Sequence, residues 1–197
     1  MNFKEFTYLI ESFEKPVILL EGSRNVLEND TDSVTNLAVK LAKRFPQALF
    51  RSGGATGSDE LFAQGVLQVN QEKMQFVLPK SRKTDFDKTN MFFFDGLPES
   101  EQEEIFTLTA KATPAYQPLI DFYKKKKPGC AFYKTQYILR DALKVCGSET
   151  LKMSRADFGC FYLNSDKPNG GGTGHTIRVC QLLDVPVFEQ TDWLKWL

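Results

Sequence analysis

The chain has 197 residues, of which 42% are hydrophobic and 25% charged, which is ordinary for a globular protein with a full core. Basic and acidic side chains both number 25, so the formal net charge is zero and there is no basic excess of the kind that marks nucleic-acid-binding proteins. No apolar run approaches the roughly 20 residues of a membrane span, and the charged N-terminal segment lacks the pattern of a signal peptide. We therefore expect a cytoplasmic protein, with neither a membrane nor nucleic acid as its partner.

The cysteines give no sign of a metal centre or a disulfide framework. Cys130, Cys146, Cys160 and Cys180 are widely spaced, and none of them forms a C-x-x-C pair. We expect free thiols and no bound metal.

The first half of the chain alternates between strands and helices. Apolar residues at helical spacing predict an amphipathic helix over residues 2–14, and the apolar run from Val17 to Leu20 predicts a strand buried on both faces. A strong helical pattern over 31–45 ends at Pro46. The remaining predicted elements are a strand at 48–50, a helix at 60–69 and a strand at 74–78. This β-α-β-α-β order is typical of a parallel sheet.

Residues 81–150 interrupt this alternation. We expect a mostly helical insertion there, with one helix at about 134–146 and no clear strand. The alternation resumes with a strand at 158–163, a loop at 164–172, a helix at 173–183 and a strand at 185–188, and Trp193 and Trp196 should seal an apolar patch. The fold class is therefore α/β: one Rossmann-like domain over residues 1–197, with a three-layer open parallel sheet, helices on both faces and a helical insertion.

Three loops rich in glycine or small polar residues follow predicted strands, at 22–24, 52–59 and 169–178. The carboxyl ends of parallel strands share one edge of a sheet, so these loops should converge there. Glycine leaves backbone N–H groups open to an anion, and a helix start adds partial positive charge. Arginine is a natural bidentate partner of phosphate. The predicted ligand-binding or phosphate-binding residues are Gly22, Ser23, Arg24, Ser52, Gly53, Gly54, Gly57, Asp59, Arg140, Gly171, Gly172, Thr173, Gly174 and His175.

Each of these signals also has a purely structural explanation. The glycines could serve only close packing of strand on helix, Asp59 could cap its helix, and His175 could make a structural hydrogen bond. Arg140 could be an ordinary salt-bridged residue. Neither glycine-rich loop has the Lys-Ser/Thr pair of a P-loop or a clean G-x-G-x-x-G pattern.

The phrases LFRSGGATGSDELFAQGV and ADFGCFYLNSDKPNGGGTGHTIRVCQLLDVPVF resemble the SLOG superfamily of Rossmann-like proteins. This group includes the DNA-processing Smf (DprA) proteins and the LOG phosphoribohydrolases, and the resemblance covers residues 16–80 and 140–190. It implies that the loops at 52–54 and 171–174 hold a nucleotide or its phosphate, and that Arg140 faces this ligand. It also implies a homodimer, since many proteins of the group pair.

The chain departs from the LOG pattern P-G-G-x-G-T-x-x-E, whose glutamate serves hydrolysis. Gly170 stands in place of the proline, His175 in place of the threonine and Arg178 in place of the glutamate. We therefore expect binding of a nucleotide-like small molecule in a sensing or carrier role, with no required cofactor beyond a bound nucleotide or phosphate. The alternative is an N-glycosidic hydrolase acting on a nucleotide or an ADP-ribose-like substrate, with Asp59 or Glu21 as the catalytic carboxylate.

Overall fold

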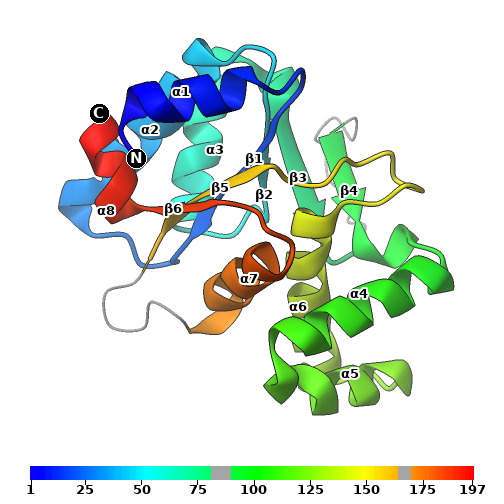
Figure 1. Ribbon diagram of the computed structural model, residues 1–197. Coiled ribbons are helices and arrows are strands. Elements are labelled where there is room, and N and C mark those ends of the chain that lie inside the picture. The colour runs from blue at the N-terminus through cyan, green and yellow to red at the C-terminus, as the bar shows by residue number, and fades with distance from the viewer. Residues whose placement is uncertain (81–89, 164–169) are drawn as a thin grey trace.

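The computed structural model describes residues 1–80, 90–163 and 170–197 (Figure 1). Within these ranges the strands form one parallel sheet in the order β4-β3-β2-β1-β5-β6. The strands are β1 (Val17–Gly22), β2 (Leu49–Ser52), β3 (Met74–Leu78), β4 (Met91–Phe93), β5 (Phe158–Tyr162) and β6 (Val187–Glu189). The predicted α/β class with a Rossmann-like open sheet is confirmed.

The strand order reverses direction once, between β1 and β5. From β1 the chain moves outward through β2 and β3 to β4, and then crosses back to place β5 on the other side of β1. Gly22 at the end of β1 pairs in register with Tyr162 at the end of β5. In open α/β sheets such a switch point leaves a crevice beyond the carboxyl ends of the two strands, where ligands bind.

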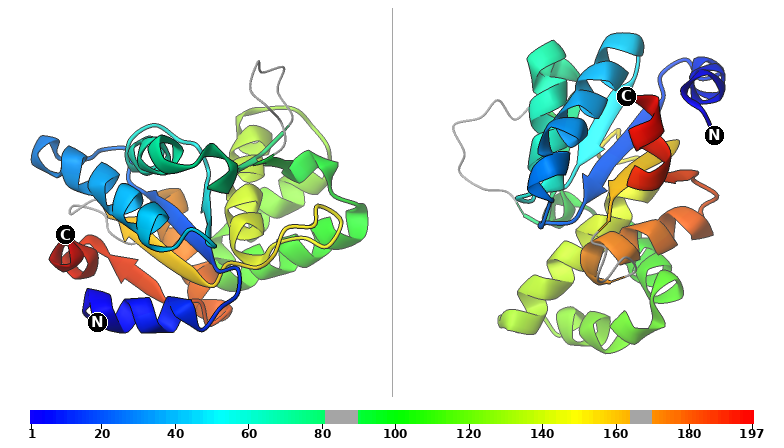
Figure 2. Two further views of the ribbon diagram at one scale, coloured as in Figure 1. Left: turned by 90° about the horizontal axis from the view of Figure 1, so that it is seen from above. Right: turned by 90° about the vertical axis from the view of Figure 1, so that its left-hand side faces the viewer.

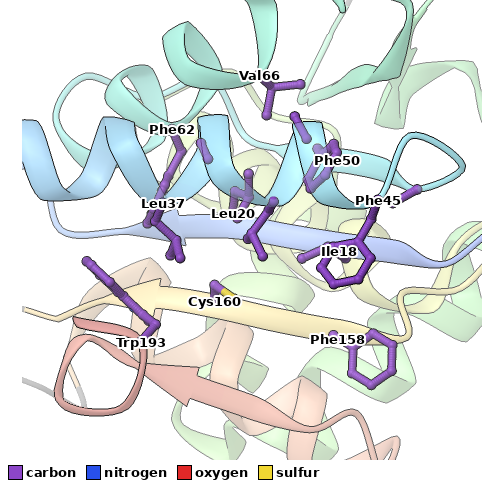
Figure 3. Close-up of a cluster of buried hydrophobic side chains, with 14 of the residues drawn as sticks. Ile18, Leu20, Leu37, Phe45, Phe50, Phe62, Val66, Phe158, Cys160 and Trp193 are labelled. Carbon is purple, nitrogen blue, oxygen red and sulfur yellow. The ribbon is translucent and has the colours of Figure 1, made fainter. Parts of the chain in front are cut away.

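One face of the sheet is covered by α1 (Phe3–Glu11), α2 (Thr31–Arg44), α3 (Ser58–Val69) and the C-terminal α8 (Gln190–Trp193) with the short η6 (Leu194–Trp196). Ile18 and Leu20 of β1 point into this core, where Phe50 and Phe62 also lie (Figure 3). Trp193 and Trp196 are buried here as well, at the place where we expected them to seal an apolar patch.

The other face carries α6 (Cys130–Cys146) and α7 (Gly171–Leu182), which pack against each other (Figure 2). Val17 and Leu19, the alternate residues of β1, point into this second core. Two further helices, α4 (Glu99–Ala112) and α5 (Gln117–Lys124), pack on α6 and complete the described part of the insertion. The helix α6 is thus the crossover that returns the chain from β4 to β5.

The insertion also contains a strand, which the sequence did not predict. Met91–Phe93 pairs with β3 as a parallel edge strand, so the expectation of no strand in this region is wrong. Three half-buried residues are too short for an alternating pattern, and the neighbouring strand supplies the pairing that makes them a strand. Residues 81–89 of the insertion, and residues 164–169 of the loop expected at 164–172, lie outside the described ranges. In the parts of the chain that are described, no helix has both the length and the apolarity of a membrane span.

Candidate ligand-binding site

A cavity of about 670 Å³ lies at the switch point, beyond the ends of β1 and β5. All three predicted loops contribute to it, together with α6 and the short helix η5 (Pro114–Tyr116) of the insertion. Its lining residues are Glu21, Gly22, Ser23, Arg24, Ala55, Asp59, Tyr116, Lys134, Tyr137, Ile138, Arg140, Asp141, Lys144, Gly170, Gly171, Gly172 and Thr173.

The structure brings eight of the fourteen predicted binding residues to this cavity and leaves six outside its lining. Those that line it are Gly22, Ser23, Arg24, Asp59, Arg140, Gly171, Gly172 and Thr173. Those that do not are Ser52, Gly53, Gly54, Gly57, Gly174 and His175.

Hydrogen bonds tie the loops to one another. Ser23 donates its N–H to the carbonyl of Tyr162 (2.7 Å), and Ser58 donates its N–H to the carbonyl of Ser23 (3.0 Å). The hydroxyl of Thr173 donates to the carbonyl of Gly22 (2.9 Å). One carboxylate oxygen of Asp59 accepts the N–H of Gly22 (3.0 Å), and the other accepts the N–H of Ala55 (3.4 Å). Asp59, the candidate catalytic carboxylate, therefore also fixes the first loop against the second.

Two glycines are needed because charged side chains of α6 occupy the space of a Cβ. A Cβ at Gly53 would lie 1.6 Å from Nη1 of Arg140, and one at Gly172 would lie 2.8 Å from Oδ2 of Asp141. The side chain of Arg140 thus covers Gly53, which is buried and does not meet the cavity. From the sequence we expected Gly53 to leave its amide open to an anion, whereas in the structure Gly53 makes room for the side chain of Arg140.

A cluster of buried ionic side chains forms the floor of the cavity. Lys144 of α6 is only 2% exposed, and its Nζ lies 2.5 Å from Oε1 of Glu21 and 2.8 Å from Oδ1 of Asp141. Arg140 adds a second cation, with its Nε 3.3 Å from the same oxygen of Asp141. Buried charges are stable only when they are paired. Here the cations of α6 pair with Asp141 of the same helix and with Glu21 of β1.

Burial changes the protonation of this floor. It raises the pKa of Glu21 to about 7, against the opposing effect of Lys144. It likewise raises the pKa of Asp59, although Lys144 and Arg140 act in the other direction. For Asp141, burial also favours the protonated form, but Lys144 and Arg140 outweigh it and hold its pKa below the ordinary value. Lys144 stays charged because Asp141 and Glu21 overcome the effect of burial and raise its pKa.

Arg51 of β2 supports the cluster from within the sheet. It is fully buried, and its Nη1 donates to the carbonyl of Lys144 (2.8 Å) while its Nε donates to Oε1 of Gln75 (3.0 Å). Its guanidinium therefore meets the last turn of α6, where the helix dipole favours positive charge. Burial lowers the pKa of Arg51 to about 10, so the side chain remains charged at neutral pH.

The N-terminus of α7 forms part of the rim. Gly171 and Gly172 are exposed, and no side chain caps this helix start within the described residues. Its first N–H groups lack intrahelical acceptors, and the helix dipole gives them partial positive charge. The exposed side chains of Arg24 and Lys134 line the same cavity.

His175 and Arg178 of α7 do not line the cavity, and both contact Thr113 of the insertion. The hydroxyl of Thr113 shares a 2.8 Å hydrogen bond with Nδ1 of His175 and accepts another from Nε of Arg178 (3.0 Å). His175 is fully buried, and burial lowers its pKa to about 4, so the ring is neutral at physiological pH. Arg178, which stands in place of the LOG glutamate, is thus not among the residues that line this cavity.

The insertion contributes a wall of the cavity that was not predicted from the sequence, and its polar and aromatic residues are Tyr116, Lys134, Tyr137, Asp141 and Lys144. A signal for the last two was present. They stand among apolar residues in the segment ILRDALKV, where helical spacing predicts burial. Charged residues at buried helix positions need partners and so point to a functional or structural cluster.

Comparisons with known proteins give a similarity by structure but none by sequence. No model of a known protein family and no curated protein sequence matches the chain. The structure is similar to that of DNA processing protein A from Helicobacter pylori, with a TM-score of 0.49 and 16% identity over 90% of this chain. The chain spans 66% of the length of that protein.

The comparison also corrects one expectation. DNA processing protein A is described by its binding of single-stranded DNA. Our expectation that nucleic acid is not a partner, which rested on the balanced charge, is contradicted by this finding. Net charge describes the whole surface, so it does not exclude a local site for a phosphate backbone.

Proposed function

We propose that this protein binds a nucleotide or a related phosphorylated small molecule in the switch-point cavity. The observation that carries the proposal is the arrangement of one cavity with a cationic rim, an aromatic wall and an acidic floor. These three surfaces correspond to the phosphate, base and sugar of a nucleotide.

The rim suits the phosphate. No side chain of the described residues caps the start of α7, and the space beside Gly171 is open, so the first N–H groups of this helix can meet an anion. Arg24 and Lys134 add positive charge to the lining of the same cavity. Arginine is suited to bidentate contact with phosphate, and lysine to a point-charge contact.

The floor and wall suit the rest of the ligand. Carboxylate oxygens accept hydrogen bonds from sugar hydroxyls, and Glu21 and Asp59 both line the cavity. Tyr116 and Tyr137 provide aromatic surface for a base. The ring of Tyr137 already faces the guanidinium of Arg140, whose central carbon lies 5.6 Å from the ring centroid.

The test is isothermal titration with adenosine 5′-monophosphate, ADP-ribose and inorganic phosphate. We expect Arg24→Gln and Lys134→Gln each to weaken binding of the charged ligands about threefold to tenfold, equivalent to roughly 1 kcal/mol. Arg155→Gln is the matched control, since Arg155 is an exposed arginine outside this cavity. A folded protein that binds none of the three ligands contradicts the proposal. A single-stranded oligothymidylate in the same titration distinguishes a small-molecule site from a surface for a nucleic-acid chain.

One observation favours a second function, N-glycosidic hydrolysis. Glu21 faces the cavity with a pKa of about 7, which suits a group that donates or accepts a proton at neutral pH. The assay is release of free base from nucleoside monophosphates, or of nicotinamide-like leaving groups from ADP-ribosyl compounds. Glu21→Gln and Asp59→Asn should abolish any turnover. An unchanged rate in either variant removes that carboxylate from the mechanism.

A further inference from the structure

We propose that the cavity takes up a proton together with its anionic ligand, and that Glu21 holds this proton. The inference rests on the proposed function, because it requires that an anion binds here. It adds a coupling between ligand affinity and pH that binding alone does not imply.

The floor of the cavity contains more carboxylates than cations. Glu21, Asp59 and Asp141 face Lys144 and Arg140, which makes three carboxylates against two cations. With every group ionised, the floor carries one negative charge in excess. This excess opposes the attraction that the cationic rim exerts on an anion, and a single added proton removes the excess.

The contacts of the three carboxylates indicate that Glu21 takes up the proton. Asp141 lies close to both cations, 2.8 Å from Nζ of Lys144 and 3.3 Å from Nε of Arg140. Burial raises the pKa of Asp59 as well, but two backbone N–H groups and both cations oppose that rise and favour its ionised form. Of the two cations of the floor, Glu21 forms an ion pair with Lys144 only, and Asp141 pairs with the same ammonium group. Glu21 is therefore the carboxylate of the floor that is protonated most readily.

The remaining neighbours of Glu21 do not change this balance. Arg51 of β2 adds positive charge to its surroundings, but Arg51 also interacts with the carboxylate of Asp157. Cys180 of α7 is within electrostatic reach, and burial raises its thiol pKa to about 12, so it stays neutral. With a pKa of about 7, Glu21 is partly protonated in the free protein at neutral pH. An anion nearby raises this pKa further, and the protein then draws a proton from solution.

The experiment measures protons directly. Wild-type protein is titrated with ADP-ribose, whose phosphates do not titrate near neutral pH, in two buffers of different ionisation enthalpy at pH 7. The dependence of the observed enthalpy on the buffer gives the number of protons bound. We expect net proton uptake at pH 7, of at most about half a proton per ligand, since a carboxyl with a pKa of about 7 is already partly protonated before the ligand binds. We also expect affinity to fall as pH rises from 6 to 8.

Two variants assign the proton. Glu21→Gln should bind with no proton uptake and with no change in affinity between pH 6 and 8. Glu60→Gln, an exposed carboxylate on α3, should keep the wild-type uptake. A ¹³C NMR titration of the wild-type side-chain carboxyls gives a second measurement, in which one glutamate resonance should titrate near pH 7 and shift to higher pH when ADP-ribose is added.

The possible failures are distinct. If neither ADP-ribose nor adenosine 5′-monophosphate binds, the proposed function is wrong and this inference falls with it. If a ligand binds without proton uptake, the binding function stands and the coupling is overturned. If uptake persists in Glu21→Gln, the assignment to Glu21 is overturned.

Discussion

The guanidinium of Arg140 occupies the space beside Gly53 that a Cβ would fill in any other residue, with Nη1 only 1.6 Å from the ideal Cβ position. One residue of the second loop and one residue of the insertion are therefore matched in shape. This pair links the backbone after β2 to the charged floor of the cavity.

Gly53→Ala should displace Arg140 and disturb the floor. We expect a loss of about 1–3 kcal/mol in the free energy of unfolding, typical of an overpacked buried site, together with weaker ligand binding. Urea denaturation and isothermal titration measure the two effects. Gly96→Ala is the control, because a Cβ at Gly96 meets no atom within 4 Å. Equal stability of both variants would show that Arg140 relocates at no cost.

Lys144→Met should be strongly destabilising, because it leaves the carboxylates of Glu21 and Asp141 buried without their shared cation. Loss of one partner from a buried ionic cluster costs about 3–5 kcal/mol. Lys195→Met, at an exposed lysine, provides the comparison in urea denaturation. Adding Glu21→Gln to Lys144→Met should recover part of the loss, and a double variant less stable than the single one argues against this account.

Glu21 should make the protein less stable as pH rises from about 4.5 to 7. In this window the folded protein holds a proton on Glu21 that the unfolded chain, with a pKa near 4.5, has already released. The folded state then binds more protons, so the free energy of unfolding falls with pH, by on the order of 3 kcal/mol over the window. Glu21→Gln should remove this slope in denaturation curves measured at half-unit pH intervals. A slope that survives the substitution has another source.

His175 should act in the opposite direction. The folded protein keeps His175 neutral down to a pH of about 4, whereas the unfolded chain protonates it near 6.5. The stability that the neutral ring contributes is therefore present above pH 6.5 and is lost as pH falls towards 4. His175→Asn should abolish this acid sensitivity, and the same denaturation series compares it with wild type. Since the chain contains one histidine, a persisting loss near pH 6 cannot be assigned to another imidazole.

The centre of the sheet was predictable because β1 and β5 are largely apolar runs. Val17 to Leu20 must be buried on both faces, and the helical pattern over 31–45 needs an apolar surface to cover. β4 was not predictable, since three residues carry no period of their own and depend on the neighbouring strand.

The position of the cavity could be predicted, but its ionic floor could not. Loops after parallel strands converge by topology, so the cavity beside Gly22 and Thr173 follows from the strand order. The ionic floor depends on how α6 crosses the sheet, and that path is set by packing between segments far apart in sequence. Lys144 and Glu21 are 123 positions apart, and no local pattern joins them.

Because Lys144 of α6 is the counter-charge of Glu21 on β1, the insertion is a structural part of the sheet domain. Excising residues 99–146 would strip the sheet of both cations beneath the switch point and leave Arg51 without the carbonyl that receives it. Any viable shortening of this chain must spare the crossover helix, and natural variation in length should be confined to the outer pair, α4 and α5.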